Sequence, residues 1–287
     1  MRPSWLRVEV TEAEVVRGMS ELLEEMGLHT VCQAARCPNL PHCWARGTAT
    51  FMILGDVCTR SCRFCAVKTG WPGGVTDPGE PARVAAAARR LKLDYVVLTS
   101  VDRDDLPDMG ASLWAETIAA VRREDPEAAV EALIPDFGGR TELLEEVLSA
   151  GPAVVGHNLE TVRRLTPAVR DRRASYDLSL EVLRKLKELS PGILTKSSLI
   201  LGLGEEESEV REAMADLREV GVDILVLGQY LRPTPSQVPV DRYLRPEEFA
   251  ELREEALAMG FRAVVASPLA RTSFRAGEIY RELVGCG

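Results

Sequence analysis

The sequence predicts an α/β fold in which six β/α units form a barrel or part-barrel. Strand-like apolar runs alternate with helical patterns from residue 49 onward. The runs, such as those at residues 95–98 and 224–227, are almost continuously apolar, as expected for parallel strands that are buried on both faces. The irregular spacing of the units favours a barrel over an open sheet, although composition alone allows both.

The expected elements follow in chain order. Strands are expected at residues 49–54, 94–99, 129–134, 153–157, 195–201 and 223–229. Helices are expected at residues 78–91, 111–123, 140–149, 159–166, 177–189 and 206–220. Outside this alternation we expect helices at residues 12–26 and 246–259 and a short strand at 262–266. Pro246 and the two glutamates after it form a good helix start.

The composition is that of an acidic globular protein. The chain has 287 residues, 46% of them hydrophobic, which suits one large domain with attachments or two ordinary domains. Its formal net charge of −9 argues against nonspecific nucleic-acid binding. No signal peptide and no run of ~18 apolar residues is visible, which predicts a soluble, cytoplasmic protein. Cytosolic thiols stay reduced, so clustered cysteines indicate metal or redox chemistry.

Six of the seven cysteines form two trios with different spacings. The loop cysteines follow the first expected strand with the spacing C-x3-C-x2-C; they are Cys58, Cys62 and Cys65. The upstream cysteines have the spacing C-x4-C-x5-C; they are Cys32, Cys37 and Cys43. The seventh, Cys286, stands alone near the C-terminus, and we interpret it as a spare thiol.

Three thiolates in a short loop can bind three irons of a four-iron cube and leave the fourth iron open to a small molecule. Zinc at Cys62 and Cys65 is the alternative, but structural zinc sites usually pair two C-x2-C knuckles, and the sequence has no second one. Unliganded thiols are a third possibility. The two trios together suggest two metal centres with different functions.

The segment CTRSCRFC, with Phe64 before the last cysteine, resembles the loop of the radical S-adenosylmethionine (SAM) superfamily. The resemblance implies a partial (β/α)6 TIM-type barrel. It also implies that the amino and carboxylate groups of SAM chelate the open iron. An electron from the cluster then yields a 5′-deoxyadenosyl radical, which abstracts hydrogen from an unactivated carbon while the protein positions and shields the reactants.

The segment from Cys32 to Trp44 resembles the auxiliary-cluster motif of the lipoyl synthase family within that superfamily. Further resembling segments lie at residues 3–7, 50–67, 99–106, 157–162 and 228–234. The resemblance implies a sulfurtransferase that inserts two sulfur atoms at C6 and C8 of an octanoyl chain, which is amide-linked to a lysine of a carrier domain. It implies two 4Fe-4S clusters, one that generates radicals from SAM and one that is consumed as the sulfur source.

The implied partners are an octanoylated lipoyl carrier domain and a low-potential electron donor such as ferredoxin or flavodoxin. The carrier would be a 2-oxoacid dehydrogenase subunit or the glycine cleavage carrier protein. We expect a monomer that binds neither nucleic acid nor membrane. One alternative is another sulfur-inserting radical SAM enzyme, similar to biotin synthase, in which the ligands of the second cluster are spread through the barrel. A non-catalytic, zinc-stabilised interaction module is the other.

The chain departs from the family pattern at two places. Acidic residues that are usual within the upstream trio are replaced by Gln33, Ala34 and His42, so the hydrogen bonding around that cluster differs. The usual arginine–serine–serine–tyrosine motif near the C-terminus is replaced by Arg-Thr-Ser-Phe at residues 271–274. The resemblance makes Ser273 the fourth ligand of the auxiliary cluster, and both a catalytic and a metal-binding residue, as are the loop cysteines.

Seven polar residues and one glycine near the strand ends are the candidate SAM or substrate contacts, because barrel enzymes place their active sites at the carboxyl ends of strands. They are Ser100, Asp102, Glu131, Asn158, Lys196, Ser198, Gly202 and Glu205. Residues 198–205 resemble the G-x-I-x-G-x-x-E segment of the superfamily, with Ser198 in place of the first glycine. Each has an alternative as a cap, turn or solvated residue; Asn158 could cap the helix expected at 159–166.

The expected organisation has three parts. Residues 1–48 form an N-terminal extension with the auxiliary-cluster ligands, residues 49–235 the radical SAM barrel, and residues 236–287 a C-terminal extension that closes over the auxiliary cluster. Five arginines between residues 163 and 173 form either a solvated surface or a docking patch for an acidic carrier domain.

Overall fold

The computed structural model describes residues 3–6, 13–45 and 49–285. By their contacts these residues form two compact units. The N-terminal unit comprises the described residues among 8–61 and 65–155, and the C-terminal unit comprises those among 1–7, 62–64 and 156–287. This division differs from the three expected segments, whose boundaries stay a prediction.

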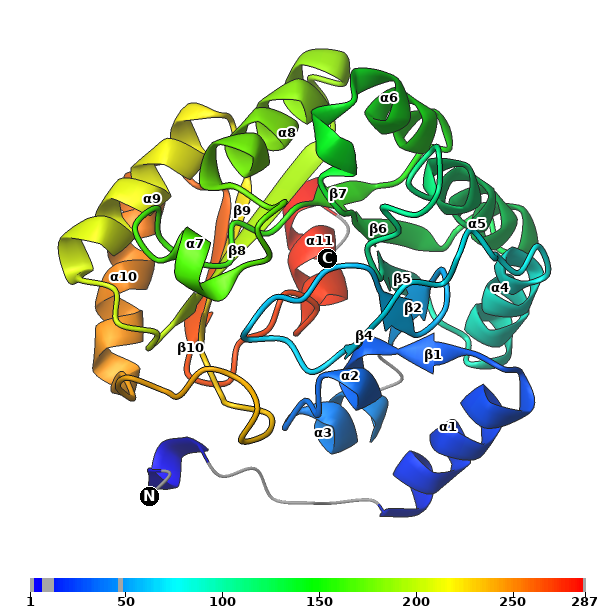
Figure 1. Cartoon of the computed structure of the whole chain (residues 1–287), viewed down its shortest axis with the longest axis horizontal. Coiled ribbons are helices and arrows are strands. Elements are labelled where there is room, and N and C mark those ends of the chain that lie inside the picture. Colours follow the sequence, from blue (N-terminus) through cyan, green and yellow to red (C-terminus); the bar gives the residue numbers. More distant parts are fainter. Residues whose placement is uncertain (1–2, 7–12, 46–48, 286–287) are drawn as a thin grey trace. The chain divides into compact units, whose positions relative to one another are not determined.

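The N-terminal unit is a β/α succession preceded by short helices (Figure 1). Its strands are β1 (His29–Thr30), β2 (Thr50–Ile53), β3 (Val57–Cys58), β4 (Lys68–Thr69), β5 (Tyr95–Ser100), β6 (Ala129–Leu133) and the start of β7 (Val154–Gly156). Its helices are α1 (Ala13–Glu25), α2 (Val31–Ala34), α3 (Leu40–Ala45), α4 (Glu80–Arg90), α5 (Ala111–Glu124), η2 (Phe137–Gly139) and α6 (Thr141–Ser149). The strands β2, β5 and β6 are parallel neighbours, and β1 pairs antiparallel with β2.

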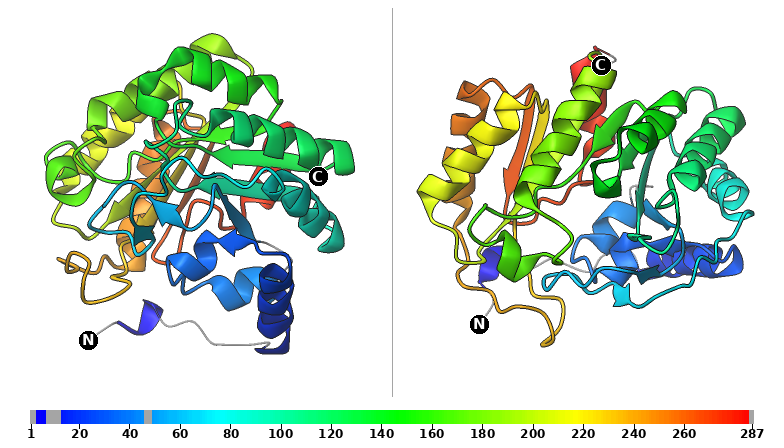
Figure 2. Two further views of the ribbon diagram at one scale, coloured as in Figure 1. Left: turned by 45° about the vertical axis from the view of Figure 1, so that its right-hand side comes forward. Right: turned by 45° about the horizontal axis from the view of Figure 1, so that its top comes forward.

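The C-terminal unit repeats the same succession. Its strands are the end of β7, β8 (Leu194–Leu201), β9 (Ile224–Gln229) and β10 (Ala263–Ser267). Its helices are η1 (Ser4–Leu6), α7 (Thr166–Val169), α8 (Tyr176–Leu189), α9 (Glu207–Glu219), α10 (Pro246–Ala258) and α11 (Ala276–Val284). The strands β8, β9 and β10 are parallel, with Ile224 of β9 opposite both Lys196 and Ala263. Helices α8, α9 and α10 cover one face of these strands, and α11 lies on the other (Figures 1 and 2).

The strands are buried on both faces, as their apolar runs predict. Every residue of β2 and β9 is buried, as are five of the six in β5. Each buried aliphatic side chain contributes about 1.5–3 kcal/mol relative to exposure, so these runs specify the sheet strongly. All six expected strands are confirmed, with ends shifted by at most two residues.

One expected helix, at residues 159–166, is wrong. Glu160 has a left-handed φ of 70° and forms a parallel bridge with Leu199 of β8. Its main chain accepts a hydrogen bond from Ile200 and donates one to Ser198, at 2.8 and 2.9 Å. The chain therefore continues beside β8, because pairing with the strand satisfies its backbone groups. Only the short α7 forms afterwards, from Thr166.

The start of the chain belongs to the C-terminal unit. In η1, the indole of Trp5 donates to the carbonyl of Leu244 at 3.3 Å, and Leu6 is buried. Leu244 directly precedes α10, so the first turn of the described chain packs against the entry to that helix. Among the described helices, none is long and apolar enough to cross a membrane.

Candidate active site

The cysteine loop begins at a turn fixed by two buried charged groups. After β2, Leu54 and Gly55 both have left-handed φ values, of 67° and 87°. The carboxylate of Glu80 accepts the N–H of Leu54 at 2.7 Å, and the guanidinium of Arg103 donates to its carbonyl at 3.2 Å. Burial raises the pKa of Glu80, although the two N–H donors of the turn lower it. After this turn the chain enters β3, which ends at Cys58.

All three loop sulfurs accept main-chain hydrogen bonds. In the N-terminal unit, Cys58 Sγ accepts from the N–H groups of Asp102 and Arg60 at 3.3 and 3.4 Å, and Cys65 Sγ accepts from Val67 at 3.4 Å. In the C-terminal unit, Cys62 Sγ accepts from Asp171 at 3.3 Å. Such bonds stabilise a thiolate and are among the factors that set the potential of a cluster. The loop thus fits the thiolate ligands of an iron–sulfur cluster.

The thiol of Cys58 is held protonated when no metal is bound. Burial is the main cause that raises its pKa to about 12, and the nearby carboxylate of Asp102 adds to it. A bound cation reverses this balance, since a coordinating thiol loses its proton outright. The residue therefore suits a metal ligand better than a free nucleophile.

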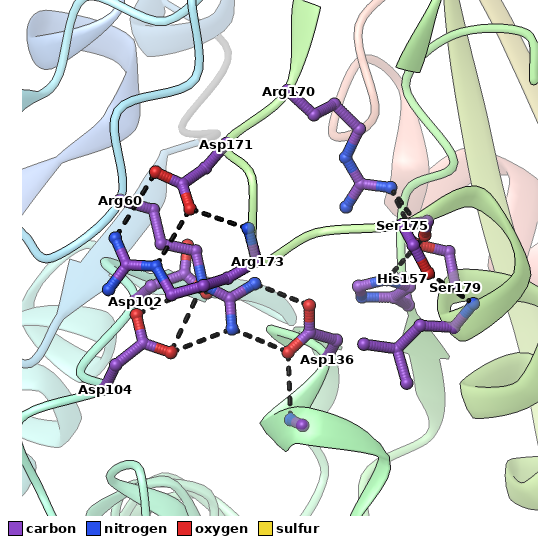
Figure 3. Close-up of polar contacts among 12 residues, drawn as sticks. Arg60, Asp102, Asp104, Asp136, His157, Arg170, Asp171, Arg173, Ser175 and Ser179 are labelled. Atoms are coloured by element: carbon purple, nitrogen blue, oxygen red, sulfur yellow. Dashed lines mark hydrogen bonds and ion pairs between the residues drawn. The ribbon is translucent and has the colours of Figure 1, made fainter. Parts of the chain in front are cut away.

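Arg60, between Cys58 and Cys62 in sequence, is surrounded by three carboxylates (Figure 3). Its guanidinium bonds Asp136 at 2.5 and 2.8 Å and Asp104 at 2.9 Å, and lies 3.4 Å from Asp102. The arginine side chain is 5% exposed and that of Asp136 only 1%. Burial is the main cause that raises the pKa of Asp102 to about 6, with Asp136 and Asp104 adding to it against Arg60. One cation among three carboxylates leaves an excess of negative charge that favours a cationic ligand.

Ser100 and Glu131 form different hydrogen bonds within the N-terminal unit. The hydroxyl oxygen of Ser100 accepts from the indole of the buried Trp114 at 3.1 Å, which leaves its own proton available for donation. Glu131 is 1% exposed inside β6 and accepts from the hydroxyl of Tyr95 at 2.6 Å. Ser100 therefore keeps a hydroxyl proton that it can donate, whereas Glu131 is part of a buried strand-to-strand contact.

Asn158 and Ser198 lie together in the C-terminal unit with a residue from near the C-terminus. The amide nitrogen of Asn158 donates to Glu160 at 3.1 Å and to Thr272 at 3.3 Å, and the hydroxyl of Thr272 donates to that of Ser198 at 3.3 Å. The Oδ1 of Asn158 is buried and has no partner within the described parts of the chain. A buried acceptor without a donor is costly, so this oxygen is open to a ligand. The N-cap alternative for Asn158 is wrong, because no helix begins at residue 159.

Contacts within the C-terminal unit fix the backbone conformation of residues 198–205. Gly202 has a φ of +97°, and a Cβ there would lie 2.2 Å from Nε2 of Gln229 and 2.4 Å from the carbonyl oxygen of Arg242. The carboxylate of Glu205 accepts the N–H groups of Gly202 and Leu203 at 2.5 and 2.9 Å. Both residues thus shape the turn itself. Lys196 lies 1% exposed inside β8.

The arginines near residues 163–173 are mostly engaged within the C-terminal unit. Arg163 pairs with Asp177, and Arg164 with Glu209 at 2.7 Å. The buried Arg170 donates to Ser179 at 2.8 Å, and His157 bonds the same hydroxyl at 3.0 Å (Figure 3). Arg173 pairs with Asp171 at 2.9 Å. These pairings favour a structural interpretation over a docking patch.

The upstream cysteines lie around α2 and α3 in the N-terminal unit. Cys32 is buried in α2, which Thr30 caps, and Cys43 lies in α3. Cys37 follows α2, and its N–H donates to the carbonyl of Cys32 at 3.0 Å. Burial is the main cause that raises the pKa of Cys32, and hydrogen bonds from Thr50 lower it. Thr50 is thus the residue that would stabilise a thiolate at Cys32.

Across the described ranges, no three His, Cys, Asp or Glu side chains gather as they would around one metal ion. Ser273 precedes α11 in the turn closed by the bond from Phe274 N–H to the carbonyl of Arg271, at 2.9 Å. Cys286 lies outside the described residues.

The fold and the cysteine loop are those of a radical SAM enzyme. A model of the Radical SAM superfamily matches residues 52–217, more than half of the chain. Methylornithine synthase aligns with a TM-score of 0.56 at 13% identity, over 96% of this chain and 95% of its own. The FeFe-hydrogenase maturase HydG from Carboxydothermus hydrogenoformans aligns with a TM-score of 0.57 at 14% identity, over 96% and 78%. These likenesses confirm the expected α/β fold of the radical SAM type.

Closer relatives define the family. The lipoyl synthase of Pyrobaculum calidifontis is 57% identical over 284 residues, which cover 98% of this chain and 97% of that protein. Those of Thermus thermophilus and Deinococcus radiodurans are 55% and 53% identical, over 98% and 99% of this chain and 87% and 86% of their own. The chain belongs to the lipoyl synthase family. It is a radical SAM sulfurtransferase with an iron–sulfur cluster and SAM as cofactors and a lipoyl carrier protein as substrate.

Sequence reasoning missed several residues that shape the site. They are Arg60, Asp104, Asp136 and Thr272. Arg60 had a signal, because it lies within the cysteine loop itself. The partners of Arg60 lie 44 and 76 residues further along, so no local pattern connects them.

Proposed function

We propose that this chain completes the lipoyl group by inserting two sulfur atoms, at C6 and C8, into an octanoyl chain bound to a carrier lysine. The observation that supports this most is the set of main-chain donors to all three loop sulfurs, in a chain of the lipoyl synthase family. The loop cysteines would hold one 4Fe-4S cluster. The upstream cysteines and Ser273 would hold a second. When bound, the first cluster with SAM supplies the radical that removes hydrogen from the octanoyl chain, and the second supplies the sulfur.

The residues of the site have separate tasks in binding SAM. The carboxylate of Asp102, beside Cys58, would accept the SAM ammonium, because the surrounding carboxylates exceed the single charge of Arg60. The hydroxyl of Ser100 would donate to the ligand while Trp114 holds its oxygen. The unpartnered Oδ1 of Asn158 would accept from a ligand hydroxyl. Burial of these groups strengthens each interaction, since the effective dielectric constant is low.

The other candidate residues would act on SAM binding less directly. They are Ser198, Gly202, Glu205, Glu131 and Lys196. Gly202 and Glu205 shape the turn after β8, and its backbone would lie along the adenosine. Ser198 would position Thr272 and, through it, Asn158. Glu131 and Lys196 would support the strands from inside. We therefore propose that SAM is contacted directly by Ser100, Asp102 and Asn158.

The resemblance to the lipoyl synthase family makes Ser273 the fourth ligand of the second cluster, and the chemistry of the donor atoms is compatible with this role. A serine oxygen is harder than a thiolate and matches iron less well, so it should release its iron more readily when the cluster gives up sulfide. Its neighbour Thr272 bonds Ser198 and Asn158, so the C-terminal motif lies among the candidate SAM contacts of the C-terminal unit. The carrier would be a 2-oxoacid dehydrogenase subunit or the glycine cleavage carrier protein, and the electron donor a ferredoxin or flavodoxin. We further propose that the protein is a monomer.

Anaerobic purification followed by iron, sulfide and zinc analysis tests the cluster assignment. Two clusters correspond to about eight irons per chain. An anaerobic assay with SAM, a reductant and an octanoylated carrier peptide should then yield lipoyl peptide and 5′-deoxyadenosine. Zinc in place of iron, or SAM cleavage without any thiolated peptide, would contradict the proposal.

A further inference from the structure

Thr59, directly after Cys58, joins the cysteine loop to the segment that follows β5. Its main-chain N–H donates to the carbonyl of Asp102 at 2.9 Å. Its hydroxyl oxygen lies 3.0 Å from the same carbonyl oxygen and 2.6 Å from a carboxylate oxygen of Asp104, and it accepts the N–H of Asp104 at 3.1 Å. Thr59 is only 6% exposed, so water has little access to replace these bonds.

The segment that Thr59 contacts is not held by the sheet. The strand β5 ends at Ser100, and no helix or strand includes residues 101–104. Main-chain groups outside regular elements still need hydrogen-bond partners when they are buried. The hydroxyl of Thr59 supplies such contacts at both Asp102 and Asp104, so it helps to fix the position of Asp102.

Asp102 faces the sulfur of Cys58 with two of its groups. Its main-chain N–H donates to Cys58 Sγ at 3.3 Å, and its Oδ2 lies 3.6 Å from the same sulfur. The N–H offsets negative charge on the sulfur, and a reduced cluster carries one more negative charge than an oxidised one. Hydrogen bonds to sulfur are accordingly a determinant of cluster potential. A shift of Asp102 would therefore change both this bond and the contact proposed for the SAM ammonium.

We propose that Thr59 is a positioning residue, whose hydroxyl holds Asp102 so that the N–H stays on the Cys58 sulfur and the carboxylate stays in reach of the SAM ammonium. The inference rests on the proposed function, which assigns Cys58 to the cluster and Asp102 to SAM. The hydroxyl carries this role because all the side-chain bonds of Thr59 run through its oxygen. Thr59 thus raises the cluster potential and strengthens SAM binding through Asp102.

The test removes the hydroxyl and keeps the size of the side chain. Thr59→Val replaces the hydroxyl by a methyl group, and Thr59→Ser keeps it. The matched control is Thr117→Val, because Thr117 is also buried but bonds the carbonyl of Leu113 within α5, at 2.7 Å. All variants are made in the full chain with the three upstream cysteines changed to Ala, so that only the loop cluster is loaded.

The Thr59→Val protein should still fold. Arg60 keeps its bond to Asp104 at 2.9 Å (Figure 3), and the main-chain N–H of Thr59 keeps its bond to Asp102. The variant therefore loosens residues 102–104 without removing every contact that holds them.

Redox titration followed by EPR gives the cluster potential, and anaerobic calorimetry gives the Kd of SAM. We expect Thr59→Val to have a lower potential and about tenfold weaker SAM binding, the factor that corresponds to one hydrogen bond of ordinary strength. Thr59→Ser and Thr117→Val should stay close to the parent. If either quantity is unchanged in Thr59→Val with its iron content intact, or if Thr59→Ser or Thr117→Val shows the same losses, the inference fails.

A measurement on the metal-free protein decides the case in which Thr59→Val does not load iron. Amide hydrogen exchange at Asp102, followed by NMR, should be faster in Thr59→Val than in the parent and in Thr59→Ser. Equal exchange rates would overturn the inference. A parent that binds no iron would instead contradict the proposed function, because it removes the cluster from the loop cysteines.

Discussion

Arg60 holds together three carboxylates beside the cysteine loop, so its removal should destabilise the protein strongly. Arg60→Met keeps much of the side-chain volume but leaves Asp136, 1% exposed, without its cation. Breaking a buried ion pair from one side costs about 3–5 kcal/mol. We expect the lower end, about 3 kcal/mol, because the N–H of Gly138 still bonds Asp136 and the hydroxyl of Thr59 still bonds Asp104.

Urea unfolding followed by circular dichroism measures this cost. With a denaturant dependence of about 3 kcal/mol per molar, the midpoint should fall by about 1 M. The matched control is Arg211→Met, since Arg211 also bonds two carboxylates, Glu255 and Glu207, but on the surface. Surface pairs contribute little, so its midpoint should stay close to that of the parent.

The pH dependence checks the electrostatic cause. The pKa of Asp102 is about 6, above its ordinary value of 3.8, so the folded protein takes up this proton more readily than the unfolded chain. The repulsion that Arg60 offsets is therefore present above about pH 6 and is relieved as the pH falls toward 4. The deficit of Arg60→Met should be smaller at pH 5 than at pH 8. A midpoint within about 0.3 M of the parent at pH 8, or a deficit that grows on acidification, would refute the reasoning.

Five further variants test the roles proposed for the site residues. Changing the three loop cysteines to Ala should abolish 5′-deoxyadenosine formation and leave about four irons per chain, and continued SAM cleavage would contradict the assignment. Changing the three upstream cysteines to Ala should leave SAM cleavage largely intact but end lipoyl formation, measured by mass spectrometry of the peptide. Ser273→Ala should also preserve cleavage and cripple sulfur insertion, while Cys286→Ala should be nearly silent; the reverse pattern would make the cysteine the ligand. Gly202→Ala should lower both stability and SAM affinity, because its Cβ would collide with Gln229 and the main chain at Arg242, and unchanged calorimetric binding would argue against this role.

The sequence predicts those parts of the fold in which the residue types of a segment indicate by themselves whether it is buried. Continuous apolar runs need burial on both faces, so the parallel strands were identified to within two residues. The helix expected at 159–166 fails because its decisive interaction is tertiary: Glu160 bridges to Leu199 and takes a left-handed φ. Backbone groups that a neighbouring strand can satisfy do not need a helix, and residues 159–166 contain no local sign of that neighbour.

The same distinction explains what could be predicted of the site. The cysteine spacings predict the ligands, because a cluster imposes such spacings locally, within eight residues for the loop trio. The donors to those sulfurs are main-chain N–H groups, as at Asp102 and Asp171, and any residue except proline supplies one. Their identity therefore leaves no mark on the sequence.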